Sequence, residues 1–114
     1  MSDCLFCKII AGQIPATIVH QDEHLIAFKD INPQAPMHVL IVPRRHVASL
    51  NDLDANDDAL VGEMVRRASA LARAQGHGDR GYRTVFNCNS DAGQTVFHIH
   101  LHVLGGRPMT WPPG

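Results

Sequence analysis

Residues 97–104 read Phe-His-Ile-His-Leu-His-Val-Leu, with a histidine at every second position and an apolar residue between. Successive side chains of a β-strand point to opposite faces, so we expect a strand that carries all the imidazoles on one face. The histidines of this row are His98, His100 and His102. The opposite, apolar face is expected to enter a core and consists of Phe97, Ile99, Leu101 and Val103. Packing alone explains three imidazoles poorly, because their ring nitrogens need partners, and the row indicates a reactive surface.

Two kinds of chemistry suit such a row. Two histidines separated by one residue can bind the same zinc ion. However, the rise of about 3.3–3.4 Å per residue puts His98 and His102 roughly 13 Å apart. Zinc–nitrogen bonds are only about 2.0–2.1 Å long, so one ion does not easily bind the whole row. Alternatively, a neutral imidazole can attack phosphorus and form a covalent intermediate. His100 has a histidine on either side to orient it, and we expect the three histidines to divide the work.

The polar turn before the histidine row adds groups that can bind an anion. Residues 91–95 read Asp-Ala-Gly-Gln-Thr. Gly93 lets the backbone N–H groups approach an anion closely, and Thr95 adds a hydroxyl. Glycine-containing turns are common, but this one leads directly into the row of histidines.

Composition limits the function classes. The chain has 114 residues, of which 45% are hydrophobic and 18% charged, and we expect one domain over residues 1–114. A net charge of −1 gives no support to a nucleic-acid or membrane partner. The N-terminus shows no secretory signal, and three cysteines are an odd number for a disulfide framework. A cytoplasmic location is therefore expected.

The order of elements predicts an α+β fold, with an antiparallel sheet of about five strands, one short helix and one long helix, packed on one side of the sheet. The short helix is expected to be capped by Asp3, to present Leu5, Phe6, Ile9 and Ile10, and to stop at Gly12. The long helix is expected over residues 56–75, and residues 89–94 as a loop. The strands are expected at 17–20, 25–29, 38–42, 82–87 and 97–104.

The stretch from His98 to Leu104 matches the His-x-His-x-His-x-x pattern, with apolar residues at x, and resembles the histidine-triad (HIT) superfamily. The likeness spans nearly the whole chain and points to the Hint branch, the purine nucleoside phosphoramidases. The other segments that carry it are residues 30–36, 38–43, 93–94, 105–107 and 111–114. The resemblance implies a HIT-like fold whose sheet continues across a homodimer.

The resemblance also implies a reaction. His100 would attack the α-phosphorus of a purine nucleoside 5′-phosphoramidate or adenylate, the amine would leave, and water would hydrolyse the nucleotidyl-histidine. His38 would hydrogen-bond and orient the nucleophile, and His102 would contact phosphate. Thr95 would act at the leaving-group end, where the Hint pattern usually has serine. No cofactor is implied for catalysis.

A set of nucleotide-binding residues comes from the same resemblance. Asp30 would bind the ribose hydroxyls, and Asn87, Gly93 and Gln94 would lie near phosphate or ribose. The purine slot would be formed by Leu5, Phe6, Ile9, Phe28 and Ile31. Purely structural roles are the alternative. Asp30 could cap the following turn, Asn87 could end a strand, and Phe6 and Phe28 could be ordinary core residues.

The pair Cys4-x-x-Cys7 resembles bacterial HIT proteins and the related galactose-1-phosphate uridylyltransferases, in which two cysteines and two histidines hold a structural zinc ion. The matching histidines here are His46 and His98. Two cysteines and two histidines make a normal tetrahedral zinc set. The alternatives are small buried apolar residues on the short helix, or a redox pair, which lacks the βαβ context it normally has.

Four functions therefore stay in view. The first is the phosphoramidase reaction, and the second is hydrolysis of dinucleoside polyphosphates within the same superfamily. The others are nucleotide-dependent regulation with little turnover, and metal storage or sensing. The tail ends in Trp-Pro-Pro-Gly and favours the first, and Met109 and Trp111 are expected to be covered by a second copy of the chain.

Overall fold

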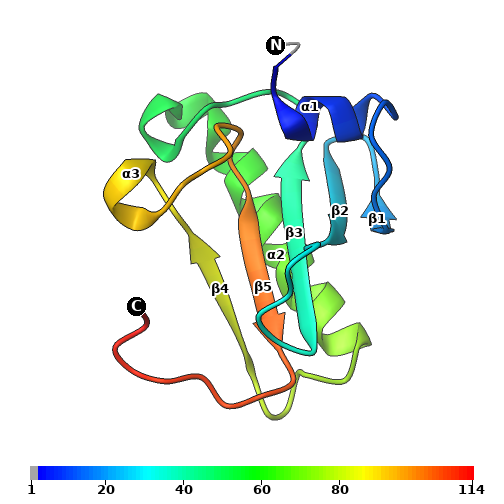
Figure 1. Ribbon diagram of the computed structural model, residues 1–114, viewed down its shortest axis with the longest axis vertical. Coiled ribbons are helices and arrows are strands. Elements are labelled where there is room, and N and C mark those ends of the chain that lie inside the picture. The colour runs from blue at the N-terminus through cyan, green and yellow to red at the C-terminus, as the bar shows by residue number, and fades with distance from the viewer. Residues whose placement is uncertain (1–2) are drawn as a thin grey trace.

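A computed structural model describes residues 3–114 and shows a five-stranded antiparallel sheet over that range (Figure 1). The strand order is β1-β2-β3-β5-β4, and neighbouring strands pair antiparallel throughout. The strands are β1 (Ile18–Gln21), β2 (Leu25–Lys29), β3 (Met37–Pro43), β4 (Tyr82–Phe86) and β5 (Leu101–Gly105). The predicted sheet is thus confirmed. We expected no secretory signal at the N-terminus. Residues 1 and 2 of that segment lie outside the described range.

The helices differ from the prediction at their ends. They are α1 (Leu5–Ile10), the 3₁₀ turns η1 (Leu50–Asp52) and η2 (Ala55–Asp57), α2 (Asp58–Ala74) and α3 (Asn89–Ala92). Asp3 is not the cap of α1: the sulfur of Cys4 takes that place and accepts a hydrogen bond from the N–H of Cys7 at 3.3 Å. Within the expected loop 89–94, the chain forms the short helix α3, which ends at Gly93. None of the helices in the described part of the chain is long and apolar enough to cross a membrane.

Helices cover both faces of the sheet, and the expectation of one covered side is wrong. Alternate residues of β2 and β3 point to opposite faces. One core lies against α2, and the other lies against α1 (Figure 1). The α2 core includes Leu25, Ala27, Val39, Ile41, Met64, Ala68, Leu101 and Val103. The α1 core consists of Phe6, Ile9, Ile26, Phe28, Leu40 and Val42. Because β3 packs on both faces, all seven of its residues are buried.

The histidine row is only partly a strand. The ladder between β3 and β5 begins with Leu101 opposite Ile41, and its register would place Ile99 opposite Pro43. Proline has no N–H for a ladder hydrogen bond, so residues 97–100 are irregular. Ile99 instead donates its N–H to the carbonyl oxygen of Val47 at 2.8 Å. Ile99, Leu101 and Val103 are buried as expected, but Phe97 is 49% exposed, and its predicted place in the core is wrong.

Candidate active site and metal cluster

A cleft of about 460 Å³ lies on the α1 side of the sheet and contains most of the predicted site. The predicted residues that line it are Leu5, Phe6, Ile9, Phe28, Asp30, Ile31, Asn87, Gly93, Thr95, His100 and His102. One side of the cleft is apolar, and the polar residues gather around the histidines. Sequence reasoning missed other lining residues, which are Ile14, Pro15, Ala16, Lys29, Leu40 and Val96. Ile14, Pro15, Ala16 and Val96 lie outside the strands, and no periodic pattern in the sequence could have revealed them.

Gln94 does not line the cleft. It is buried, and its side-chain amide donates hydrogen bonds to the carbonyl oxygens of Ala48 at 2.8 Å and Val96 at 3.1 Å. Its side-chain oxygen accepts a hydrogen bond from the N–H of Asn89 at 2.8 Å. Every polar atom of this amide is thus used to hold the loop that leads from α3 to the histidines.

The imidazole of His38 has a defined tautomer. Its Nδ1 accepts a hydrogen bond from the backbone N–H of Gln34 at 3.0 Å, so the ring proton of neutral His38 is on Nε2. Nε2 then donates to Nδ1 of His102 at 2.9 Å. Since Nδ1 of His102 is the acceptor, the proton of neutral His102 is on its Nε2. The structure thus joins His38 to His102, and not to His100 as the resemblance implied.

His100 has its free nitrogen on the opposite side of the ring. Its Nδ1 donates a hydrogen bond to the carbonyl oxygen of His98 at 2.8 Å, which leaves Nε2 unprotonated. The His100 ring lies edge-on to Phe6, with ring centroids 5.0 Å apart, and its centroid is also 5.0 Å from that of His102. Of the two histidines expected beside the ring of His100, only His102 packs against it, and His98 contacts it through its backbone oxygen.

Burial keeps these imidazoles neutral. It lowers the pKa of both His38 and His100 from the ordinary value. In His102, burial and the nearby charges that His100 and His38 would carry lower the pKa to about 4. At neutral pH, His100 therefore has a free lone pair and His102 keeps a single N–H.

Asp30 caps the turn that follows β2, as considered above, and also lies beside His38. Its Oδ1 accepts a hydrogen bond from the N–H of Asn32 at 2.8 Å, which stabilises the turn after β2. Its Oδ2 lies 3.5 Å from Nε2 of His38 and faces the cleft. The negative charge of Asp30 raises the pKa of His38, His100 and His102, which partly offsets the effect of their burial. His38 itself does not line the cleft and meets it through His102.

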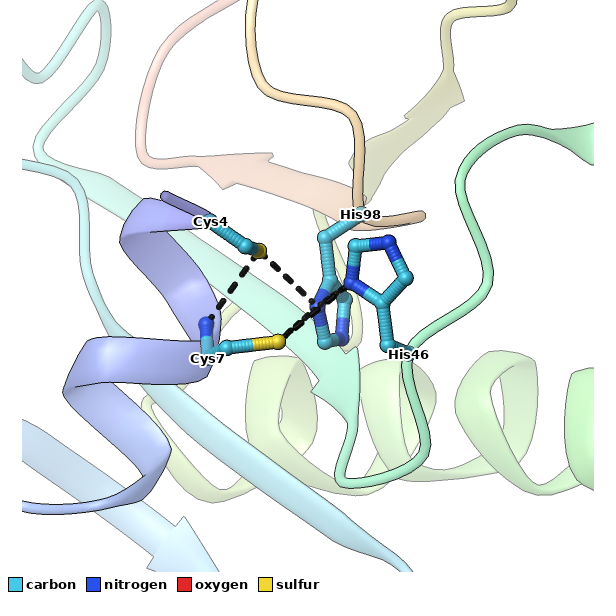
Figure 2. A group of neighbouring side chains, drawn as sticks. All are labelled: Cys4, Cys7, His46 and His98. Atoms are coloured by element: carbon cyan, nitrogen blue, oxygen red, sulfur yellow. Dashed lines mark hydrogen bonds between the residues drawn. The ribbon is translucent and has the colours of Figure 1, made fainter. Parts of the chain in front are cut away.

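A second cluster brings together residues from three separate segments of the chain (Figure 2). Cys4 caps α1 and Cys7 lies within it, His46 follows β3, and His98 precedes β5. The Sγ atoms of Cys4 and Cys7 lie 3.4 and 3.5 Å from Nδ1 of His98. Nδ1 of His46 lies 3.3 Å from Sγ of Cys7 and 3.2 Å from Nδ1 of His98.

These separations fit a tetrahedral zinc ion. Zinc bonds of about 2.0–2.3 Å at tetrahedral angles put ligand atoms about 3.3–3.8 Å apart. The tautomer of His98 also fits, because its Nε2 donates to the carbonyl oxygen of Pro43 at 2.7 Å. Nδ1 is then free to bind a metal, and the carbonyl oxygen of Pro43 fixes the orientation of the ring, as backbone acceptors commonly do for metal-bound histidines. His98 is fully buried and belongs to this cluster and not to the cleft.

The cluster of Asp30, His38 and His102 is also compact enough for a metal ion. The facing nitrogens of its two histidines already share a hydrogen bond, however. A metal on Nε2 of His38 would move that proton to Nδ1, where it would face the N–H of Gln34. The hydrogen bonds therefore favour a proton between His38 and His102, and a metal ion at the cysteine cluster.

The fold and the site together define an α+β protein in which two histidines of the row, His100 and His102, line a cleft beside the last strand. The family model described as "Scavenger mRNA decapping enzyme C-term binding" matches residues 3–111. The chain is 44% identical over 107 residues to the purine nucleoside phosphoramidase of Escherichia coli, covering 94% of this chain and 90% of that protein. The chain belongs to the histidine-triad family, and it is a hydrolase of that family.

Solved structures agree with the fold. A HIT family hydrolase from Legionella pneumophila superposes with a TM-score of 0.97 at 56% identity, covering 98% of this chain and 100% of the other. A zinc-bound histidine triad family protein from Mycobacterium smegmatis superposes with a TM-score of 0.81 at 33% identity, covering 93% and 76%.

Proposed function

We propose that this chain, as a single domain, hydrolyses the P–N bond of purine nucleoside 5′-phosphoramidates, or the acyl-phosphate bond of adenylates, through a covalent nucleotide on His100. The observation that carries this proposal is the hydrogen bond from Nδ1 of His100 to the carbonyl oxygen of His98, which leaves Nε2 free at the cleft. The name of the E. coli relative supports the substrate class.

In the proposed reaction, the lone pair on Nε2 of His100 attacks the α-phosphorus. The P–N bond breaks, and the amine leaves with a proton taken from the solvent, to which the water of the second step returns one. The Nε2–H of His102 donates to a phosphoryl oxygen, where negative charge accumulates. Water then attacks the phosphorus of the nucleotidyl-histidine, which releases the nucleoside monophosphate and restores neutral His100.

The two sides of the cleft suit the two parts of a nucleoside. Phe6, Ile9 and Phe28 provide an apolar surface for a purine. Phe6 and Phe28 pack edge to face, with centroids 5.4 Å apart, so they are core residues as well. Oδ2 of Asp30 accepts from the ribose hydroxyls, and Asn87, Gly93 and Thr95 lie toward the phosphate.

A substrate comparison tests this proposal. We expect adenosine 5′-phosphoramidate to be hydrolysed to AMP with a kcat/KM at least roughly tenfold above that for diadenosine tetraphosphate. Liquid chromatography of the products measures both reactions. A preference for the dinucleotide would favour the other hydrolase class, and tight AMP binding without turnover would favour a regulatory role.

The proposal includes a structural zinc ion on Cys4, Cys7, His46 and His98, whose separations fit it. A zinc ion there would tie α1 to the segments after β3 and before β5, and α1 carries one side of the cleft. No metal is assigned to the reaction itself. We place the enzyme in the cytoplasm, where cysteines stay reduced and can bind zinc.

We also propose a homodimer. Strand β4 pairs only with β5 within the described residues, so its other edge can be covered by a second copy. Trp111 is 83% exposed, and the exposed Val65 lies on α2. An isologous dimer would bury such apolar groups. Sedimentation velocity is expected to give the mass of two chains, and a monomer at micromolar concentration would contradict this.

A further inference from the structure

One residue of the loop between β2 and β3 connects the cleft to the tail of the chain. The backbone N–H of Gln34 donates to Nδ1 of His38 at 3.0 Å. The carbonyl oxygen of the same residue accepts a hydrogen bond from Nε of Arg107 at 2.9 Å. The backbone of Gln34 therefore links the guanidinium of Arg107 to His38, which is hydrogen-bonded to His102 at the cleft.

The tail also touches this loop through packing. Gly106 has a φ of +96°, and a Cβ atom at this position would lie 2.8 Å from Cβ of Pro36. A side chain would both strain the backbone and push the loop away. Arg107 is held as well, because its Nη1 donates to the carbonyl oxygen of Pro108 at 3.0 Å. Two independent contacts thus fix the tail against the loop beside Gln34.

The loop's other side-chain hydrogen bonds are local. Asn32 donates its N–H to Oδ1 of Asp30 at 2.8 Å, and the side-chain amide of Gln34 donates to the carbonyl oxygen of Asn32 at 3.0 Å. These bonds shape the turn but do not fix it against another element. Arg107 supplies that connection from residues that lie after the last strand.

We propose that Arg107 is a positioning residue for the reaction, and that it acts through Gln34 on the tautomers of His38 and His102. With Gln34 in place, His38 has its proton on Nε2, and His102 presents an N–H on its own Nε2. If the N–H of Gln34 moves away, Nδ1 of His38 can take the proton instead. His102 then has no donor at Nδ1 and can present a lone pair to the phosphate, which repels it.

A pair of matched variants tests this role, which rests on the proposed function only for its kinetic part. Arg107→Met removes the donor to Gln34 and keeps the aliphatic part of an exposed side chain. Arg83→Met is the control, because Nη2 of Arg83 donates to the carbonyl oxygen of Thr110 at 2.9 Å. Both arginines hold the tail, but only Arg107 bonds to the loop.

For Arg107→Met, we expect kcat on adenosine 5′-phosphoramidate to fall by about 10–100-fold while KM changes by less than about twofold. Arg83→Met is expected to change neither by more than about twofold. The ¹⁵N shifts of the imidazoles should show His38 protonated on Nε2 in the wild type and in Arg83→Met, with a mixture of tautomers in Arg107→Met.

Three results would overturn the proposal. They are an unchanged kcat in Arg107→Met, an equal loss in both variants, and a His38 tautomer that is the same in all three proteins. If the wild type fails to hydrolyse any phosphoramidate, the proposed function is wrong. The ¹⁵N shifts then still decide whether Arg107 sets the tautomer of His38.

Discussion

Replacing His100 with alanine is expected to lower kcat on adenosine 5′-phosphoramidate by at least about a thousandfold, because the covalent route loses its nucleophile. Binding of AMP should change much less, since the apolar side of the cleft and Asp30 remain. Single-turnover kinetics measure the first effect, and isothermal titration calorimetry measures the second. The loss of rate without loss of affinity is the expected signature of a group that acts only in the chemical step.

His20→Ala is the matched control, because His20 bonds to Asp22 at 2.8 Å and does not line the cleft. It should keep the wild-type kcat. Acid quenching of the wild type during turnover, followed by peptide mass spectrometry, should locate the nucleotide on His100. A nucleotide on His98 or His102, or a near-normal kcat in His100→Ala, would contradict the proposed nucleophile.

The alternation of residue types predicted much of the sheet, because it depends only on local backbone geometry. The run from His38 to Val42 reads as a buried strand, and β3 is buried along its whole length. The start of β5 could not be predicted in the same way. It depends on Pro43, a residue far away in the chain that the register of β3 and β5 would place opposite Ile99.

The same distinction applies to the site. Residue types and the family resemblance identified Cys4, Cys7, His46 and His98, and the structure brings these four together. The tautomers could not be predicted, because they are set by backbone groups. The acceptors are the carbonyl oxygens of Pro43 and His98, and the donor is the N–H of Gln34. Tertiary contacts place these groups, so no pattern in the sequence reports them.

The geometry of the cysteine cluster leads to the second large effect. Burial and the neighbouring Cys4 raise the pKa of the Cys7 thiol, so without a metal Cys7 stays protonated at neutral pH. Zinc binding must displace the proton of Cys7, and the free energy of zinc binding then adds to the stability of the fold. We expect about one zinc ion per chain in protein purified without chelator, measured by plasma mass spectrometry.

Cys7→Ser is expected to lose this zinc ion and to lower the melting temperature by more than about 10 °C, because α1 is then no longer tied to His46 and His98. The effect on kcat at 25 °C should be smaller, less than about tenfold, since Nδ1 of His100 bonds to the backbone of His98 and not to its ring. Cys88→Ser is the matched control, because Cys88 is free and lies outside the cluster. A chelator should reproduce the loss of stability in the wild type and leave Cys7→Ser unchanged. Normal stability in Cys7→Ser, together with wild-type protein that contains no metal, would show that this cluster is only a group of packed side chains.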